Sequence, residues 1–183
     1  MVKFQYCSDI HLEFYDLFHR DSAIENNFET IIKPGAAPYL ILPGDIGQPH
    51  LPLFRQFFEW CSKHWQEVFY VTGNHEYYSS EKPPLPMDFI EDEIAYALRG
   101  LDNVHWLCQG CPGGTMSRDI SGTDVTIVGT TLWTYIDEED EQNVKAHMMD
   151  YRVIGTPYGI KGNRTIEPYE ISIMHMLQKQ NVS

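Results

Sequence analysis

The chain has 183 residues, of which 43% are hydrophobic and 21% charged, enough for one globular domain with a real core and too few for two comfortable ones. Its formal net charge of −13 argues against a general nucleic-acid-binding surface, because phosphate contacts need a basic face. The sequence contains no apolar stretch near the roughly 20 residues that span a bilayer, which excludes a membrane-spanning segment.

The first half of the chain alternates strand-like with helix-like segments. Three apolar runs that predict strands cover residues 2–7, 39–43 and 68–72. Two segments with helical spacing of their apolar residues cover 51–64 and about 87–101. Pro86 precedes the second of them, and acidic side chains in its first turn favour a helix start there. Strand–helix–strand units imply parallel pairing with right-handed crossovers, so we predict the α/β class.

The second half is less regular. Strands are predicted at 104–107 and at 125–132, where apolar and polar residues alternate. The acidic run 137–141 lacks the Gly and Asx spacing of a calcium loop, and we interpret it as a solvated loop. A final helix is predicted at 167–180, with Ile171 and Met174 on its apolar face.

Cysteine content bears on the compartment. Four cysteines in a chain of this kind fit a reducing environment, where they need not pair. Cys108 and Cys111 form a lone C-x-x-C, and a structural zinc would need a second pair that Cys7 and Cys61 do not make. We therefore interpret them as small residues at a strand end and turn. The first strand follows Met1 directly and leaves no room for a secretory signal, so we expect a cytoplasmic protein.

Each predicted strand of the first half ends in a short polar block. The blocks are Ser8-Asp9-Ile10-His11, Gly44-Asp45 and Gly73-Asn74-His75-Glu76. The carboxyl ends of neighbouring parallel strands meet at one edge of a sheet, so these side chains should converge on one crevice. They offer oxygen and imidazole donors without a thiolate. Such a set suits borderline or hard divalent metals, and a shared carboxylate can bridge two of them.

Each block alone has a simpler explanation. An Asp after a strand is commonly a turn or helix-capping residue, which weakens Asp9 and Asp45 as isolated signals. Asn74 and His75, adjacent in a glycine turn after a buried strand, are harder to explain by packing. His147 and His175 lie beside methionines in helix-like segments, and we interpret both as helix-face residues.

In order and spacing, the three blocks resemble the first three motifs of the calcineurin-like metallophosphoesterase family. Residues 129–133 and 150–154 resemble further stretches of a bacterial-type branch of that family. The resemblance implies a sandwich of two β-sheets flanked by helices. It also implies a hydrolase acting on a small phosphate ester, as a phosphomonoesterase or phosphodiesterase, at a dinuclear site of divalent manganese, iron or zinc.

The resemblance also implies roles for individual residues. Asp9 and His11 would hold the first metal, Asp45 would bridge, and Asn74 would offer its amide oxygen to the second metal. His75 would protonate or stabilise the leaving oxygen as the catalytic residue.

The sequence departs from the family after these motifs. Family members continue with a His-containing strand end and a Gly-His-x-His block, and neither His105, His147 nor His175 lies in such a context. Residues 1–183 are therefore expected to form a single but incomplete domain, truncated on its C-terminal side, whose second metal site has too few ligands to be occupied reliably. We expect self-association or a second chain that supplies the missing ligands. The alternative function is a catalytically impaired fragment or an interaction scaffold of the same fold.

Overall fold

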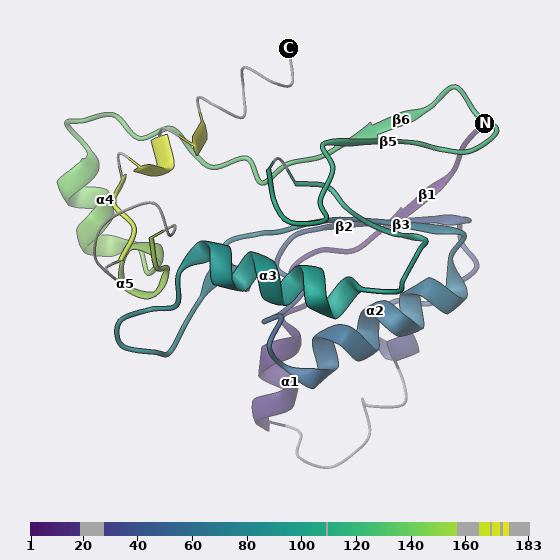
Figure 1. Cartoon of the computed structure of the whole chain (residues 1–183), viewed down its shortest axis with the longest axis horizontal. Helices are drawn as coiled ribbons and strands as arrows, with labels where there is room; N and C mark the ends of the chain where they lie inside the picture. The colour runs from purple at the N-terminus through teal and green to yellow at the C-terminus, as the bar shows by residue number, and fades with distance from the viewer. Residues whose placement is uncertain (19–27, 109, 157–164, 169, 173, 176–183) are drawn as a thin grey trace.

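The computed structural model describes residues 1–18, 28–108, 110–156, 165–168, 170–172 and 174–175. Its centre is a four-stranded parallel sheet in the order β1-β2-β3-β4 (Figure 1). The strands are β1 (Phe4–Tyr6), β2 (Tyr39–Pro43), β3 (Glu67–Val71) and β4 (Val104–Trp106). All four predicted positions of these strands are confirmed. Parallel pairing sets the carboxyl ends of β1, β2 and β3 side by side.

Three helices cover one face of this sheet (Figure 1). They are α1 (Leu12–Phe18), α2 (Pro52–His64) and α3 (Met87–Leu98), and short 3₁₀ turns occur at Phe28–Thr30 and His75–Tyr77. Helix α2 begins at a proline, which suits the first turn because no intrahelical hydrogen bond is lost there. Its buried Phe54 and Phe58 contact the Tyr70 ring of β3 at centroid distances of 6.0 and 4.9 Å. The helix-facing side of the sheet is thus closed by aromatic packing.

A two-stranded antiparallel hairpin lies over the other face (Figure 1). It consists of β5 (Ser117–Asp119) and β6 (Thr126–Val128). The strand predicted at 125–132 is therefore shorter than expected: beyond Gly129 the chain turns toward β3, where the Thr131 hydroxyl donates to the Thr72 carbonyl at 2.7 Å. Strand β5 is polar and exposed, so its sequence carries no apolar alternation from which to predict it. The mixed α/β class and the presence of a second sheet agree with the expectation.

The last described segments pack as short helices. They are α4 (Glu141–His147) and α5 (Asp150–Val153), followed by helical residues 168, 170–172 and 174–175. Within the segment predicted as the final helix, residues 168, 170–172 and 174–175 are helical, Glu167 is not, and positions 169, 173 and 176–180 lie outside the described residues. Residues 137–140 of the acidic run are exposed, as expected of a solvated loop, whereas Glu141 begins α4.

Cys108 and Cys111 form a disulfide with a Cα–Cα distance of 5.7 Å. This corrects the expectation that they are unpaired small residues, since a Cα–Cα separation of this size allows a disulfide bond. Cys7 and Cys61 are free.

None of the helices in the described part of the chain combines the length and apolar character that crossing a bilayer requires.

Glu91 on α3 makes stability depend on pH. Burial first, and the charge of Asp88 second, raise its pKa from 4.5 to about 7. Between these values the folded chain keeps a proton that the unfolded chain has released, so stability falls as pH rises through this window. We expect Glu91→Gln to stabilise the protein on the order of 1–3 kcal/mol at pH 8 and to change little at pH 4.5. Thermal unfolding at both pH values measures this.

A matched control for this prediction is Glu138→Gln, which removes an exposed carboxylate. It should leave the melting temperature nearly unchanged at both pH values. A Glu91→Gln variant that melts at the wild-type temperature at pH 8 would contradict the raised pKa.

Candidate active site

The three polar blocks lie together at the carboxyl ends of β1, β2 and β3. Backbone hydrogen bonds join the first two blocks, from Asp9 N to the Gly44 carbonyl at 3.2 Å and from His11 N to the Asp45 carbonyl at 3.0 Å. The third block joins them through His75 N, which donates to Asp45 Oδ1 at 3.0 Å. The convergence expected from strand order is therefore present, and it is held by the backbone as well as by side chains.

The backbone is strained at three residues whose side chains could bind a metal. Asp9, His11 and Asp45 have φ values of 54°, 53° and 54°, and they are the non-glycine residues with positive φ in the described part of the chain. The left-handed region costs such residues roughly 1–3 kcal/mol each and is characteristic of functional sites. All three are residues predicted to bind metal.

Glycine at position 73 permits the close approach of the second and third blocks. A Cβ atom there would lie 2.1 Å from Asp45 Oδ1 and 2.7 Å from the Asp45 backbone nitrogen. Any side chain would displace the Asp45 carboxylate, which explains why the block that carries Asn74 and His75 begins with glycine.

Two overlapping groups of donor atoms could hold a cation. Donor atoms of Asp9, His11 and Asp45 lie within 4.8 Å of one another, and so do those of His11, Glu13 and His75. Asp9 is exposed, whereas His11 and Asp45 are half-buried, so the first group faces solvent. Two carboxylates and an imidazole at this separation suit one divalent ion with coordination positions left over for water or substrate.

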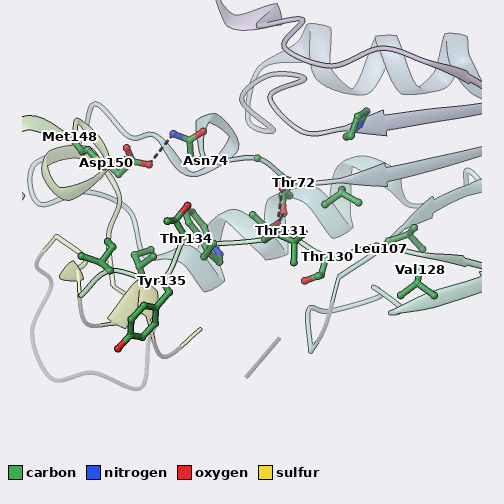
Figure 2. Close-up of a pocket in the computed structure, with 18 of the residues that line it drawn as sticks. Thr72, Asn74, Leu107, Val128, Thr130, Thr131, Thr134, Tyr135, Met148 and Asp150 are labelled. Atoms are coloured by element: carbon green, nitrogen blue, oxygen red, sulfur yellow. Dashed lines mark hydrogen bonds between the residues drawn. The ribbon is translucent and has the colours of Figure 1, made fainter. Parts of the chain in front are cut away.

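Asn74 lies at the edge of this cluster and is held by a carboxylate that sequence reasoning missed. Its amide nitrogen donates to Asp150 Oδ1 at 2.9 Å and to the Tyr78 hydroxyl at 3.1 Å. Figure 2 shows the Asn74 nitrogen directed at Asp150, with the amide oxygen on the opposite side. Asp150 is buried at the start of α5. Burial of the Tyr78 hydroxyl, and next the charge of Asp150, raise the pKa of Tyr78 to about 12.

Glu76, the last residue of the third block, is fully buried and binds backbone. Its carboxylate accepts hydrogen bonds from the backbone nitrogens of Asp45, Ile46 and Gly73 at 3.1, 2.8 and 2.8 Å. Burial raises its pKa to about 7, partly offset by the hydrogen bond from Ile46 and reinforced by the Asp45 charge. Glu76 thus fixes the Asp45 turn against the third block.

His75 is enclosed by three side chains. Its ring stacks on Tyr78 with a centroid distance of 4.2 Å and meets the edge of His11 at 4.4 Å. Its Nδ1 lies 3.2 Å from Oε1 of Glu13, a residue at the second position of α1. Sequence reasoning missed Glu13 as well, although it stands only two residues after His11, the last residue of the first block.

The later histidines lie apart from both donor groups. His105 contacts Glu67 at 3.1 Å between neighbouring strands. His147 is exposed on α4, with Nδ1 directed at the Asn143 carbonyl, and His175 contacts the Trp133 carbonyl. Neither His147 nor His175 joins a metal-binding group among the described residues, in agreement with their interpretation as helix-face residues.

An apolar groove of about 1050 Å³ begins beside this site. Asn74 and Asp150 line one end, Leu107 and Val128 line the other, and Thr131 lies between them (Figure 2). The groove follows the face of the parallel sheet that α1, α2 and α3 do not cover.

Comparisons with known proteins agree with this geometry. The family model described as calcineurin-like phosphoesterase matches residues 2–148. An uncharacterized protein, L509, of Acanthamoeba polyphaga mimivirus is 32% identical over 152 residues, which are 82% of this chain and 51% of that protein. The chain thus spans about half the length of this curated relative. No solved structure matches the chain significantly. From the family match, which covers most of its length, the chain belongs to the calcineurin-like phosphoesterase family.

Proposed function

We propose that this protein hydrolyses a phosphate ester, as a phosphomonoesterase or phosphodiesterase, with two divalent metal ions. The observation that carries the proposal is the cluster of Asp9, His11 and Asp45, whose donor atoms lie within 4.8 Å of one another. Asp9 and His11 would hold the first metal, Asp45 would be shared by both, and Asn74 would offer its amide oxygen to the second. The donor chemistry fits manganese, iron or zinc.

When bound, metals of this kind supply Lewis-acid stabilisation of the phosphoryl oxygens and make a bound water more acidic. The chain's own residues do the rest. The Asp45 carboxylate holds the backbone of His75 in place through the 3.0 Å hydrogen bond. His75 donates a proton to the leaving oxygen, which is general acid catalysis. The stacked Tyr78 ring limits the orientations that His75 can adopt.

Mn²⁺ titration followed by turnover tests this function. The metal-stripped protein should bind Mn²⁺ and then hydrolyse p-nitrophenyl phosphate or its bis-aryl diester, with activity lost on chelation. Mn²⁺ binding without turnover of either ester would favour the alternative, an interaction scaffold of the same fold.

Asp150 should support the second metal through Asn74. We expect Asp150→Ala to weaken the second Mn²⁺ equivalent about 10–100-fold and to leave the first unchanged, because loss of an outer partner disorients the ligand that it holds. Calorimetric titration resolves the two equivalents, and Glu139→Ala, which removes an exposed carboxylate, is the control. Equal weakening of both equivalents would contradict the assignment.

We propose further that residues 1–183 form a single, incomplete domain that associates with a second copy. Two ligands, Asp45 and Asn74, are few for a dedicated metal site. The apolar groove beside them carries exposed Leu132 and Tyr135 along its wall, at 74% and 49% exposure, and such patches mark contact surfaces.

Light scattering during size-exclusion chromatography tests this association. A mass above that of the 21.2 kDa monomer is expected. A monomer that binds two metals and turns over esters by itself would contradict it.

A further inference from the structure

Glu13 lies between the two histidines of the site. It is 3% exposed, near the start of α1, whereas both histidines are half-buried. Its Oε1 atom is 3.1 Å from Nδ1 of His11 and 3.2 Å from Nδ1 of His75. A single carboxylate oxygen thus contacts the same nitrogen of both rings, and the rings themselves lie 4.4 Å apart.

The second carboxylate oxygen is an exception to the usual rule for buried polar atoms. Glu13 Oε2 is buried and has no hydrogen-bond partner among the described residues. Such an atom carries a desolvation cost that no hydrogen bond offsets. Among the described residues, the side chains within ion-pair distance of Glu13 are His11 and His75, so no Arg or Lys compensates it. An acid retained at this energetic disadvantage calls for a role in the site.

The geometry defines the state of both rings. A carboxylate can only accept hydrogen bonds, so each contact requires a proton on Nδ1 of the histidine. In the neutral imidazole this leaves the lone pair on Nε2. His11 would then present the Nε2 lone pair to a metal. His75 would face the leaving oxygen with Nε2, from which it donates a proton only when both ring nitrogens are protonated, and in that form Nδ1–H still donates to Glu13. One buried carboxylate would set the tautomer and orientation of both.

We propose that Glu13 is a shared positioning residue for His11 and His75, coupling the metal ligand to the residue that acts on the leaving group. The proposal rests on the proposed function for the roles of the two histidines. Its structural part, the tautomer of each ring, does not. A carboxylate behind a metal-binding histidine is known to fix its tautomer and to raise its basicity as a ligand.

The same atoms also allow Glu13 a different role, which the experiment must distinguish from positioning. Donor atoms of His11, Glu13 and His75 lie within 4.8 Å of one another, so Glu13 could itself be a metal ligand. A ligand and a positioning residue respond differently to an isosteric amide. Glu13→Gln keeps a carbonyl oxygen with two lone pairs, which can still accept Nδ1–H hydrogen bonds, whereas Glu13→Leu removes every acceptor.

Two measurements on the full chain test the proposal. Long-range ¹H–¹⁵N spectra of the metal-free protein at pH 8 should show both rings as the Nδ1–H tautomer. Glu13→Leu should convert them to the Nε2–H tautomer or a mixture, and Glu13→Gln should preserve the tautomer of at least one ring. Calorimetry with Mn²⁺ should show an affinity about 10–100-fold weaker for Glu13→Leu and a smaller loss for Glu13→Gln. Glu138→Leu, at an exposed position, is the control.

The outcomes separate this proposal from the proposed function. Unchanged tautomers in Glu13→Leu would overturn the positioning role whether or not the protein turns over an ester. Loss of Mn²⁺ binding in Glu13→Gln as complete as that in Asp45→Asn would overturn it in favour of a direct ligand. If Glu13→Leu fails to fold, the spectra and the Mn²⁺ affinity of Glu13→Gln still decide between the two. Absence of ester turnover with the expected tautomers would contradict the function and leave the positioning role standing.

Discussion

Asp45→Asn should remove Mn²⁺ binding from the site. Asp45 is half-buried, its donor oxygen lies within 4.8 Å of those of Asp9 and His11, and it is the carboxylate that both metals would share. We expect an affinity loss greater than the roughly 10–100-fold that follows from loss of an outer partner, because the amide removes a charge from the coordination sphere itself. Calorimetric titration with MnCl₂ measures the loss directly.

Asparagine is the right replacement because of the backbone. Asp45 has a φ of 54°, a region that Asn adopts more readily than Ala, so Asp45→Ala would mix strain with ligand loss. The Asn carbonyl can also still accept the hydrogen bond from His75 N. Asp102→Asn, at an exposed turn after α3, is a matched control that should bind Mn²⁺ like the wild type. Unchanged affinity in Asp45→Asn would rule out the shared-ligand role.

Much of the fold follows from local sequence patterns. Each of the four parallel strands begins within about two residues of the start of an apolar run in the sequence. Helices α2 and α3 coincide with segments whose apolar residues have helical spacing. Convergence of Asp9, Asp45 and Asn74 at one edge follows from strand order alone, because parallel strands share a carboxyl end. The polar blocks directly after buried strands are therefore the sequence feature that best predicts where the candidate site lies.

The missed parts depend on contacts between distant segments. Asp150 meets Asn74 across 76 sequence positions, and no local pattern relates the two. Glu13 lies two residues after the first block, but its bond to His75 spans 62 positions. The hairpin strand β5 is wholly exposed, so burial imposes no alternation on its sequence. Tertiary contact, rather than periodicity, decides each of these features.

Glu76 shows how a motif residue can serve the site without touching a ligand. It belongs to the third block, yet its carboxylate binds three backbone nitrogens and not a metal-binding side chain. The sequence places Glu76 beside His75 but cannot distinguish a buried structural carboxylate from a catalytic one. Burial and hydrogen-bond partners make that distinction.

His75→Ala should slow ester hydrolysis far more than it weakens metal binding. If His75 protonates the leaving oxygen, its removal should lower kcat on the order of 10²–10⁴-fold, the usual contribution of a positioned acid. Asp9, His11 and Asp45 stay in place, so Mn²⁺ affinity should change little. Calorimetry and steady-state kinetics on one preparation give both quantities. His147→Ala, which removes an exposed histidine of α4, is the control.

The leaving group provides the sharpest form of this test. Aryl phosphates whose phenols have low pKa need little protonation of the leaving oxygen, so the rate loss in His75→Ala should shrink as the leaving group becomes more acidic. A residue that only holds the metal or the fold would give the same loss with every ester. Metal content that falls in parallel with the rate, or a loss independent of the leaving group, would therefore remove His75 from the chemistry and place it among the ligands with His11 and Glu13.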